Sequence, residues 1–361
     1  MFYIYNITMI LKTACSLFSG CGGDTLGMEN AGISVDIYSE LQPVFQETHN
    51  SNFSHSKLLG GDITKITDSS ISEWHNKIDV VFAGFPCQSF SNAGKKDPDD
   101  PRGQLFKEFA RVVKLTNPKV LIGENVKGLL TRTTKNGSKI IDIISDEFHK
   151  LGYSIVTKVY KLHECGVPQK RERLIILGFR NDIGITPSLP DISEPPTNLR
   201  NIVSFSMKGA LQVDPAMFDG IPAECILTDL CDSSQQDSTT HPFLRQKAAE
   251  RNVSYNDSKT HTFAFSFGKR VTPIHCEIID IRNPSKTIIC TYERQPRLFV
   301  PLKNSIGYFL RPLLPDELKQ IQGFPSDYTL CGKDKEKIIQ VGNAVPPPLI
   351  TKIVEHVKNI T

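Results

Sequence analysis

Short runs of apolar residues alternate with longer amphipathic stretches from Leu11 to Arg180. Runs that are apolar throughout are typical of strands that are covered on both faces, as in a parallel sheet. The pattern predicts strands at Lys12–Phe18, Val35–Ser39, Asp79–Ala83, Val120–Glu124, Ser154–Leu162 and Arg173–Phe179, and helices at Gln104–Leu115 and Lys139–Leu151. Strands and helices that alternate in this way indicate an α/β fold with a doubly wound, mostly parallel sheet.

The pattern changes after Arg180. The proline-rich stretch Pro187–Pro196 is typical of a linker, and few long apolar runs follow it. Helical spacing returns at Asn343–Lys358, which predicts a closing helix. We therefore expect a large domain at residues 1–180, completed by 330–361, a smaller second domain at 181–310, and a hinge region at 311–329.

Composition excludes a disordered, collagen-like or coiled-coil protein, and any basic patch must be confined to one part of the chain. The chain has 361 residues, of which 39% are hydrophobic and 22% charged, as in an ordinary globular protein. A net charge of +3 does not by itself indicate a polyanionic partner. The charges are segregated, however: residues 182–237 hold nine acids and two bases, whereas 241–311 hold twelve bases and five acids.

The cysteines and the apolar runs bear on location. Nine cysteines occur without a C-x-x-C pair, so neither a disulfide framework nor a metal site is indicated, and a cytoplasmic location is expected. No apolar run approaches the roughly 18 residues that a membrane helix needs, so no membrane association is expected.

A glycine-rich turn follows the first predicted strand, at Phe18-Ser-Gly20-Cys-Gly22-Gly23-Asp24. Such a turn between a strand and a helix lets the backbone approach a nucleotide-like ligand, although it could also be only a tight structural turn. Glu40 ends the next strand, where it could accept hydrogen bonds from two ribose hydroxyls. Thr25 stands where a dinucleotide fingerprint would have its third small residue, and no P-loop motif occurs.

Two further strand ends carry residues suited to catalysis. Gly84–Ser91 contains Pro86-Cys87-Gln88 directly after a buried strand, and Glu124-Asn125 ends the next one. Neighbouring strand ends would bring a Cys87 nucleophile beside the Glu124 carboxyl, whose burial could raise its pKa enough to donate a proton. Arg171 and Arg173 begin a later strand at alternate positions, and so on one face. The alternative interpretations are that Cys87 is a small buried core residue and that Arg171 and Arg173 are ordinary surface arginines.

Taken in order, these stretches closely resemble the cytosine-5 DNA methyltransferase family of the bacterial restriction-modification type. The resemblance covers nearly the whole chain except about residues 181–283. It rests on Phe18-x-Gly20-x-Gly22-Gly23, Glu40, Gly61-Asp62-Ile63, Gly84–Ser91, Arg102-Gly103-x-Leu105-Phe106, Glu124-Asn125-Val126, Gln169-x-Arg171-x-Arg173, Arg311–Pro325 and Gln340-x-Gly342-Asn343-Ala344-Val345-Pro346.

The resemblance implies a catalytic domain that binds S-adenosylmethionine and a smaller target-recognition domain, with double-stranded DNA between them. It implies a monomer, and a restriction endonuclease of the same recognition sequence could exist without direct contact. By analogy, the cofactor-binding residues are Phe18, Gly20, Gly22, Glu40, Asp62, Ile63, Leu105, Asn343 and Val345. Many family members carry aspartate where this chain has Ser16, which leaves one contact of the cofactor loop in question.

The resemblance also implies the reaction. Cys87 would add to carbon 6 of a flipped-out cytosine, Glu124 would protonate or hydrogen-bond ring nitrogen 3, and Arg173 with Arg171 would hold the base oxygen. Pro86, Gln88 and Asn125 would bind the substrate base, and residues 92–102 would close over the DNA. In the second domain, Lys269 and Arg270 are predicted to bind DNA, and the alternating residues Phe263, Phe265 and Phe267 to pack in the core.

Two other activities remain possible from the sequence. The glycine turn and Glu40 would suit an NAD-dependent oxidoreductase, which would leave Cys87, Glu124 and the arginines without a role. One branch of the same family methylates cytosine in tRNA. The long segment between Arg173 and Arg311 favours a protein that reads DNA.

Overall fold

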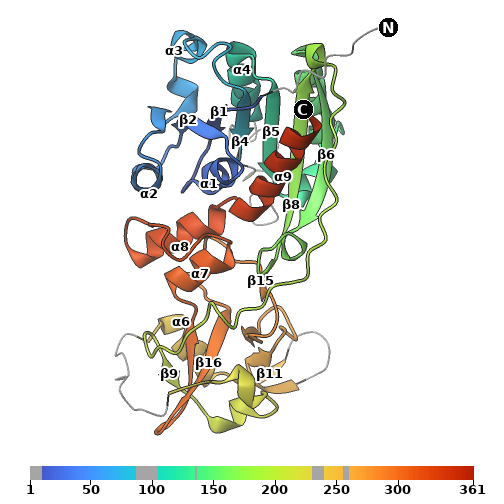
Figure 1. The fold of residues 1–361 in the computed structure, drawn as a ribbon. Helices are drawn as coiled ribbons and strands as arrows, with labels where there is room; N and C mark the ends of the chain where they lie inside the picture. Colours follow the sequence, from blue (N-terminus) through green and yellow to red (C-terminus); the bar gives the residue numbers. More distant parts are fainter. Residues whose placement is uncertain (1–9, 87–104, 135, 230–239, 255–259) are drawn as a thin grey trace.

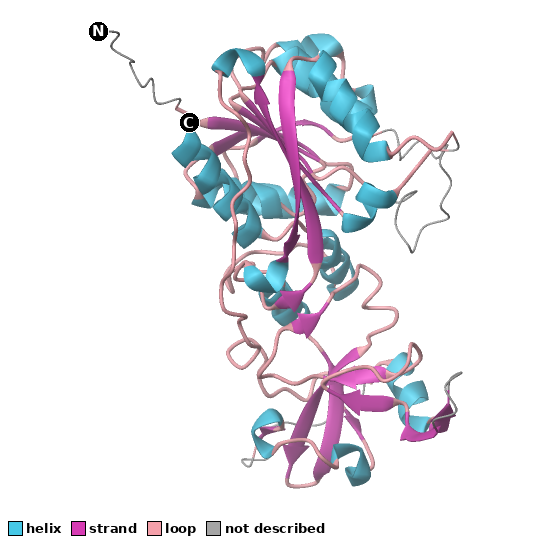
Figure 2. Ribbon diagram, turned by 90° about the vertical axis from the view of Figure 1, so that its right-hand side faces the viewer, coloured by secondary structure: helices cyan, strands magenta, loops and turns pink. Residues whose placement is uncertain are grey.

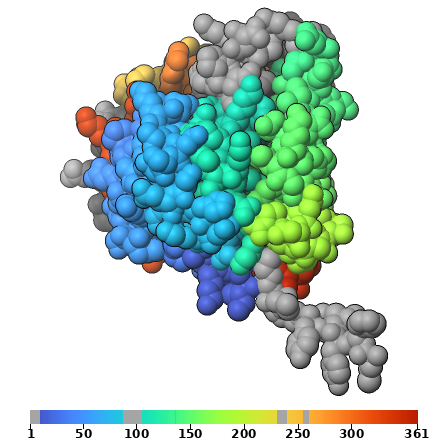
Figure 3. All heavy atoms as spheres, turned by 90° about the horizontal axis from the view of Figure 1, so that it is seen from above, coloured from blue at the N-terminus to red at the C-terminus, as the bar shows by residue number. Residues whose placement is uncertain are grey.

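The described part of the chain forms two lobes, each built around its own sheet (Figure 1). The structure is a computed structural model that describes residues 10–86, 105–134, 136–229, 240–254 and 260–361. Helices α7 (Pro315–Ile321) and α8 (Asp334–Asn343) lie between the lobes. Seen from above, the large lobe exposes segments from the first half of the chain, coloured blue to green in Figure 3.

The large lobe contains a seven-stranded sheet in the order β3-β2-β1-β4-β5-β8-β6. Adjacent strands are parallel from β3 to β5, whereas β8 is antiparallel to both of its neighbours. The bounds are β1 Thr13–Leu17, β2 Ser34–Ser39, β3 Lys57–Gly60, β4 Val80–Ala83, β5 Val120–Asn125, β6 Tyr153–Lys161 and β8 Glu172–Arg180. The predicted α/β fold with a mostly parallel sheet is therefore confirmed.

Helices cover both faces of this sheet (Figure 2). Strand β4 shows why, because Val81 and Ala83 enter one hydrophobic core while Val80 and Phe82 enter another. One face carries α4 (Phe106–Thr116) and α5 (Ile140–Lys150), and the other carries α1 (Gly23–Asn30) and α9 (Pro347–Ile360). Helices α2 (Pro43–Asn52) and α3 (Asp68–Ser72) complete the lobe. Side chains buried on both faces account for strands that read as continuous apolar runs.

The structure differs from the sequence-based expectation at two elements of the large lobe. The edge strand β3 was not predicted, because an apolar run as short as Leu58-Leu59 gives no clear strand pattern. The predicted helix Asn343–Lys358 is in fact the end of α8 followed by α9, with a break at Ala344–Pro346. Proline at 346, 347 and 348 explains the break, since proline is accepted in the first turn of a helix but not in its interior.

The second lobe is built on a sheet of short strands in the order β13-β14-β16-β17-β9, with β10 paired to β16. Its core contains Phe265, and Phe263 and Phe267 pack against that core, as predicted. A helix, α6, and two small ribbons, β11 with β12 and β7 with β15, flank the sheet. The bounds are β7 Gln169–Lys170, β9 Leu211–Gln212, β10 Leu227–Thr228, α6 Pro242–Ala249, β11 Arg251–Ser254, β12 Thr260–Phe263, β13 Phe265–Phe267, β14 Cys276–Ile278, β15 Ser285–Lys286, β16 Leu298–Asn304 and β17 Gly307–Pro312.

The proline-rich stretch that leads to the second lobe is fastened to the large lobe. Both Lys158 Nζ and the Tyr160 hydroxyl donate to the Pro190 carbonyl, at 2.7 and 2.8 Å. Lys352 of α9 forms an ion pair with Glu194. The stretch connects two lobes, as a linker does, but it lies along β6 and α9.

Candidate active site

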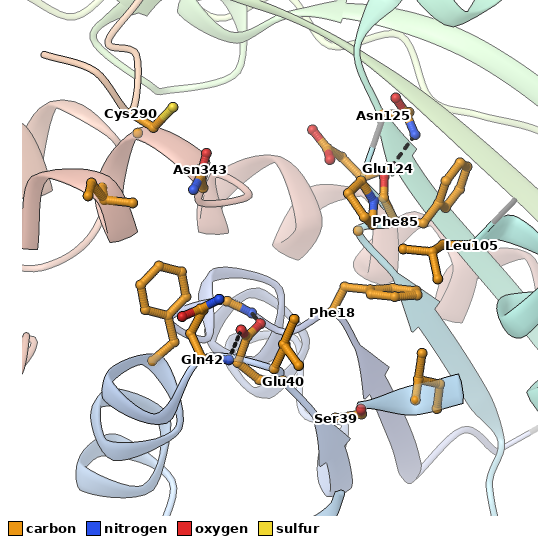
Figure 4. A pocket seen from close by; sticks show the side chains of 18 of the residues that line it. Phe18, Ser39, Glu40, Gln42, Phe85, Leu105, Glu124, Asn125, Cys290 and Asn343 are labelled. Atoms are coloured by element: carbon orange, nitrogen blue, oxygen red, sulfur yellow. Dashed lines mark hydrogen bonds between the residues drawn. The ribbon is translucent and has the colours of Figure 1, made fainter. Parts of the chain in front are cut away.

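A cavity of about 670 Å³ opens at the carboxyl ends of β1, β2, β4 and β5 (Figure 4). In an open α/β sheet this edge is where ligands bind. Figure 4 shows Glu40 and Gln42 on one side of the cavity, Glu124 and Asn125 on another, and Asn343 and Cys290 across from them. The predicted site residues that line it are Phe18, Gly20, Glu40, Asp62, Ile63, Pro86, Leu105, Glu124, Asn125, Arg171, Arg173 and Asn343.

The glycine turn and Glu40 are joined by hydrogen bonds. Gly20 N donates to Glu40 Oε2 at 2.8 Å, and Gln42 N donates to Glu40 Oε1 at 2.8 Å. Gly20 has φ +58°, a left-handed conformation that favours glycine. Burial raises the pKa of Glu40, against the lowering effect of these backbone donors. The carboxylate is thus held in one orientation at the cavity wall, and each oxygen keeps a lone pair for a ligand hydroxyl.

The loop after β3 forms another wall and is braced by a residue that the sequence did not reveal. Asp62 Oδ1 accepts hydrogen bonds from Thr64 N and Thr64 Oγ1, at 3.1 and 2.7 Å. Arg111 of α4 donates from Nη2 to the Ile63 carbonyl at 2.7 Å. No sequence motif includes Arg111, and only the packing of α4 brings it to this loop.

Asn125 holds the backbone that leads into the predicted nucleophile. Its Nδ2 donates to the Phe85 carbonyl at 3.1 Å, and its Oδ1 accepts from Val126 N at 2.8 Å. Asn125 is buried, and Pro86 lines the cavity just beyond the bonded carbonyl. Cys87 and Gln88 lie outside the described residues, as does the predicted DNA-covering segment 92–102.

Glu124 and Arg173 form a buried ion pair at the cavity. Arg173 Nε lies 2.6 Å from Glu124 Oε1, and only 8% of Glu124 is exposed. Burial raises the pKa of Glu124, while the charges of Arg173 and Arg171 oppose that rise. The same burial lowers the pKa of Arg173. A carboxyl with a raised pKa in a cavity is suited to proton donation.

Arg171 has a different set of partners from Arg173. It lies just before β8, and it donates from Nη1 to the Ile288 carbonyl at 2.8 Å and from Nη1 and Nη2 to the Gly342 carbonyl at 3.2 Å. Burial and the charge of Arg173 lower the pKa of Arg171. Both arginines line the cavity, while Glu172 between them is exposed, and Arg171 in addition ties the second lobe to the end of α8.

Close packing around Gly342 brings the Cys290 thiol to the cavity. A Cβ at residue 342 would lie 2.4 Å from Cys290 N, so only glycine allows the segment Ile289–Cys290 to approach. Cys290 is half-buried and lines the cavity from the second lobe. No sequence signal marks it, because a single cysteine without a neighbouring motif reads as a core residue.

Four predicted residues lie away from the lining of this cavity. Gly22 has φ +82° and begins α1, and the Val345 carbonyl would lie 2.0 Å from a Cβ at Gly23. Gly22 and Val345 therefore shape the glycine turn without lining the cavity. Lys269 and Arg270 are exposed between β13 and β14 in the second lobe. Their predicted contacts with cofactor or DNA stay predictions.

Ser16 and the buried Asp24 are hydrogen-bonded beneath the glycine turn. Ser16 Oγ donates to Asp24 Oδ2, and only 1% of Asp24 is exposed. Burial raises the pKa of Asp24 to about 7, although the Ser16 hydroxyl and backbone donors lower it. Position 16 thus carries a hydroxyl, and the acid of this pair is Asp24.

We predict that Asp24→Asn alters the pH dependence of stability. Folded Asp24 keeps its proton up to about pH 7, whereas an unfolded aspartate loses it near pH ~3.9. Between these values the folded state binds more protons, so the stability contributed by Asp24 is lost as pH rises. Melting temperatures from pH 4 to 8 should therefore show the variant gaining on the wild type as pH rises. A constant difference would contradict the prediction.

Comparison with known proteins shows which proteins the chain is similar to. The family model described as C-5 cytosine-specific DNA methylase matches residues 13–359. The chain is 33% identical to Type II methyltransferase M1.HphI of Haemophilus parahaemolyticus, over 98% of this chain and 88% of the relative. It is 32% identical to Type II methyltransferase M.Eco47II of Escherichia coli, over 94% and 77%. Among solved structures, DNMT2 of Spodoptera frugiperda matches with TM-score 0.64 and 18% identity, over 97% and 99%, a likeness of fold.

Proposed function

Since the chain belongs to the C-5 cytosine-specific DNA methylase family, we propose that it methylates carbon 5 of a cytosine flipped out of double-stranded DNA. Cys87 is the proposed nucleophile. The observation that carries this proposal is the buried Glu124 carboxyl, 2.6 Å from Arg173, in the cavity that Pro86 also lines. The Type II methyltransferase relatives further support a role as the modification enzyme of a restriction-modification system.

The residues of the cavity fit S-adenosylmethionine as the methyl donor. A volume of about 670 Å³ is in the range of pockets that hold ligands of this size. Glu40 would hold the ribose hydroxyls, Asp62 and Ile63 the adenine, and Phe18, Leu105 and Asn343 the remaining surface. When bound, the cofactor supplies an electrophilic methyl group.

The proposed chemistry depends on making carbon 5 of cytosine nucleophilic. The Cys87 thiolate adds to carbon 6, which breaks the 5,6 double bond and moves charge toward ring nitrogen 3. Glu124 stabilises that charge by giving its proton to nitrogen 3, and Arg173 keeps the carboxyl oriented. After carbon 5 is methylated, a base removes the carbon 5 proton, the double bond re-forms and the thiolate leaves.

The alternative activities have less support. An NAD-dependent oxidoreductase would not need the Glu124–Arg173 pair, and the family model matches methylases over nearly the whole chain. A tRNA methyltransferase is disfavoured because the Type II methyltransferases in the comparison match over most of their length.

Bisulfite sequencing of plasmid DNA from cells that express the protein tests the proposed function. Cytosines protected from conversion should occur in one sequence context, and a Glu124→Gln variant should protect few or none. Absence of protection by the wild type, with S-adenosylmethionine binding intact, would contradict DNA cytosine methylation. Protection of tRNA in the same cells would favour the alternative.

The charge segregation of the second lobe leads to a prediction about DNA affinity. We expect residues 241–311 to face DNA and residues 182–237 to face away from it. Each lysine or arginine that contacts a phosphate releases bound counterions. Lys269→Gln or Arg270→Gln should therefore weaken binding and reduce the slope of log affinity against log salt by about one.

Asp229→Asn is the matched control for these variants, because it changes charge by the same amount in the acidic segment. It should leave the salt slope unchanged. Residues of the basic and the acidic segment also form ion pairs with each other: Arg251 pairs with Asp214 at 3.3 Å and Arg282 with Glu224 at 3.0 Å. Asp232, another acid of this segment, lies outside the described residues. If Asp229→Asn changed the salt slope while Lys269→Gln and Arg270→Gln did not, the acidic segment of the second lobe would face DNA.

A further inference from the structure

A second, smaller cavity of about 130 Å³ lies where the two lobes meet. Its lining is polar and comes mainly from the second lobe, with Glu277 of β14 and Lys286 of β15, and it includes Lys170 of β7, the short strand that leads into β8 of the large lobe. Its volume is far below that of the first cavity, so it can admit the edge of a ligand but not a whole nucleotide.

Glu277 has a carboxylate without a partner in this cavity. Its neighbours on β14, Cys276 and Ile278, belong to the hydrophobic core, so the alternation of the strand directs Glu277 to the opposite face. Only 5% of Glu277 is exposed, and its Oε2 has no hydrogen-bond partner among the described residues. Leaving a buried acceptor unsatisfied is costly, which favours a ligand that donates a hydrogen bond here.

Three bases and one acid act on this carboxylate. Lys286, Arg270 and Lys170 attract Glu277 and Asp280 repels it, and none of the three bases forms an ion pair with Glu277 within the described chain. Lysines and arginines around an acceptor are suited to a ligand that carries phosphates and also presents a hydrogen-bond donor. A nucleic acid has both.

The backbone places this cavity next to the candidate active site. Lys170 lines the small cavity and the following residue, Arg171, lines the large one. Consecutive Cα atoms are about 3.8 Å apart, and base pairs in DNA are stacked about 3.4 Å apart. On the proposed function, a duplex whose target cytosine enters the large cavity would bring the base pairs beside that cytosine toward the small one.

We propose that Glu277 determines sequence specificity by accepting a hydrogen bond from the exocyclic N4 amino group of a cytosine near the methylated base. Carboxylates pair with this amino group in the major groove, whereas guanine and thymine present acceptor oxygens that a carboxylate repels. Adenine places the N7 acceptor beside its amino group and suits an amide better. This inference rests on the proposed function.

The test is the sequence context of methylation for the wild type, Glu277→Ala and Glu277→Gln, read by bisulfite sequencing of a randomised plasmid library. The wild type should require cytosine at one position close to the methylated base. Glu277→Ala should reduce that discrimination about tenfold to a hundredfold, and Glu277→Gln should move it toward adenine. Glu293→Gln, which removes a similar charge outside the cavity, should keep the wild-type context.

A second measurement changes the DNA substrate and leaves the protein unchanged. Replacing that cytosine by 2-pyrimidinone removes the amino group alone, and should lower the methylation rate of the wild type by about the same factor as Glu277→Ala does. Glu277→Ala should lose no further activity on the duplex that contains 2-pyrimidinone, because this variant already lacks the hydrogen bond to the amino group. S-adenosylmethionine binding by each variant checks that it is folded.

Unchanged context in both Glu277 variants, or an equal change in Glu293→Gln, would overturn the assignment of Glu277 while leaving the proposed function standing. Additive losses for Glu277→Ala and 2-pyrimidinone would overturn it as well. A wild type that methylates no cytosine in DNA would instead contradict the proposed function, and the role of Glu277 with it.

Discussion

Cys87→Ala should abolish methyl transfer to DNA while S-adenosylmethionine binding and thermal stability stay close to those of the wild type. The expected loss is complete because carbon 5 of cytosine is too weak a nucleophile until the thiolate has added to carbon 6. The measurement is a single-turnover assay of methyl transfer. Covalent trapping on DNA that contains 5-fluorocytosine should also vanish, because fluorine at carbon 5 blocks the final elimination.

Cys290→Ala is the matched control, since Cys290 is a half-buried thiol that lines the cavity. Like Cys87→Ala it removes one thiol, in this case from the second lobe, and it should keep both methyl transfer and trapping. If Cys87→Ala still formed the trapped complex and Cys290→Ala did not, the nucleophile would be assigned to the wrong cysteine.

Glu124→Gln should slow the chemical step by about a hundredfold to ten-thousandfold, the usual contribution of a positioned general acid. DNA affinity should change little, because the lost interaction develops with charge in the transition state. The wild-type rate should fall on the alkaline side as Glu124 loses the proton that its raised pKa retains. That alkaline decline should be absent from the variant, because glutamine does not titrate.

Glu172→Gln is the control for this substitution. Glu172 stands between Arg171 and Arg173 in sequence, but it is the exposed partner of Lys127 at 3.1 Å and is not among the described residues that line the cavity. It should leave the single-turnover rate and its pH profile unchanged. A Glu124→Gln enzyme with normal chemistry, or with a defect confined to DNA affinity, would remove Glu124 from the catalytic step.

Much of the candidate site could be predicted because its residues occur at the ends of strands. Strands β1, β2, β4 and β5 run in parallel, so the residues that follow Leu17, Ser39, Ala83 and Gly123 meet at one edge of the sheet. Local sequence patterns therefore brought Phe18, Glu40, Pro86 and Glu124 together correctly. The same reasoning predicted little about the second lobe, whose strands are short and whose pairings join distant segments.

The sequence by itself determined the α/β class, the chemical character of the site and the order of its motifs, because these depend on local periodicity and on residues adjacent in the chain. Only the tertiary structure decided the partner of each buried group. Arg171 and Arg173 are two positions apart, yet one binds the Ile288 and Gly342 carbonyls and the other pairs with Glu124. Such choices depend on contacts between segments that are far apart in the sequence, 117 and 171 residues for the partners of Arg171, and on which groups burial removes from water.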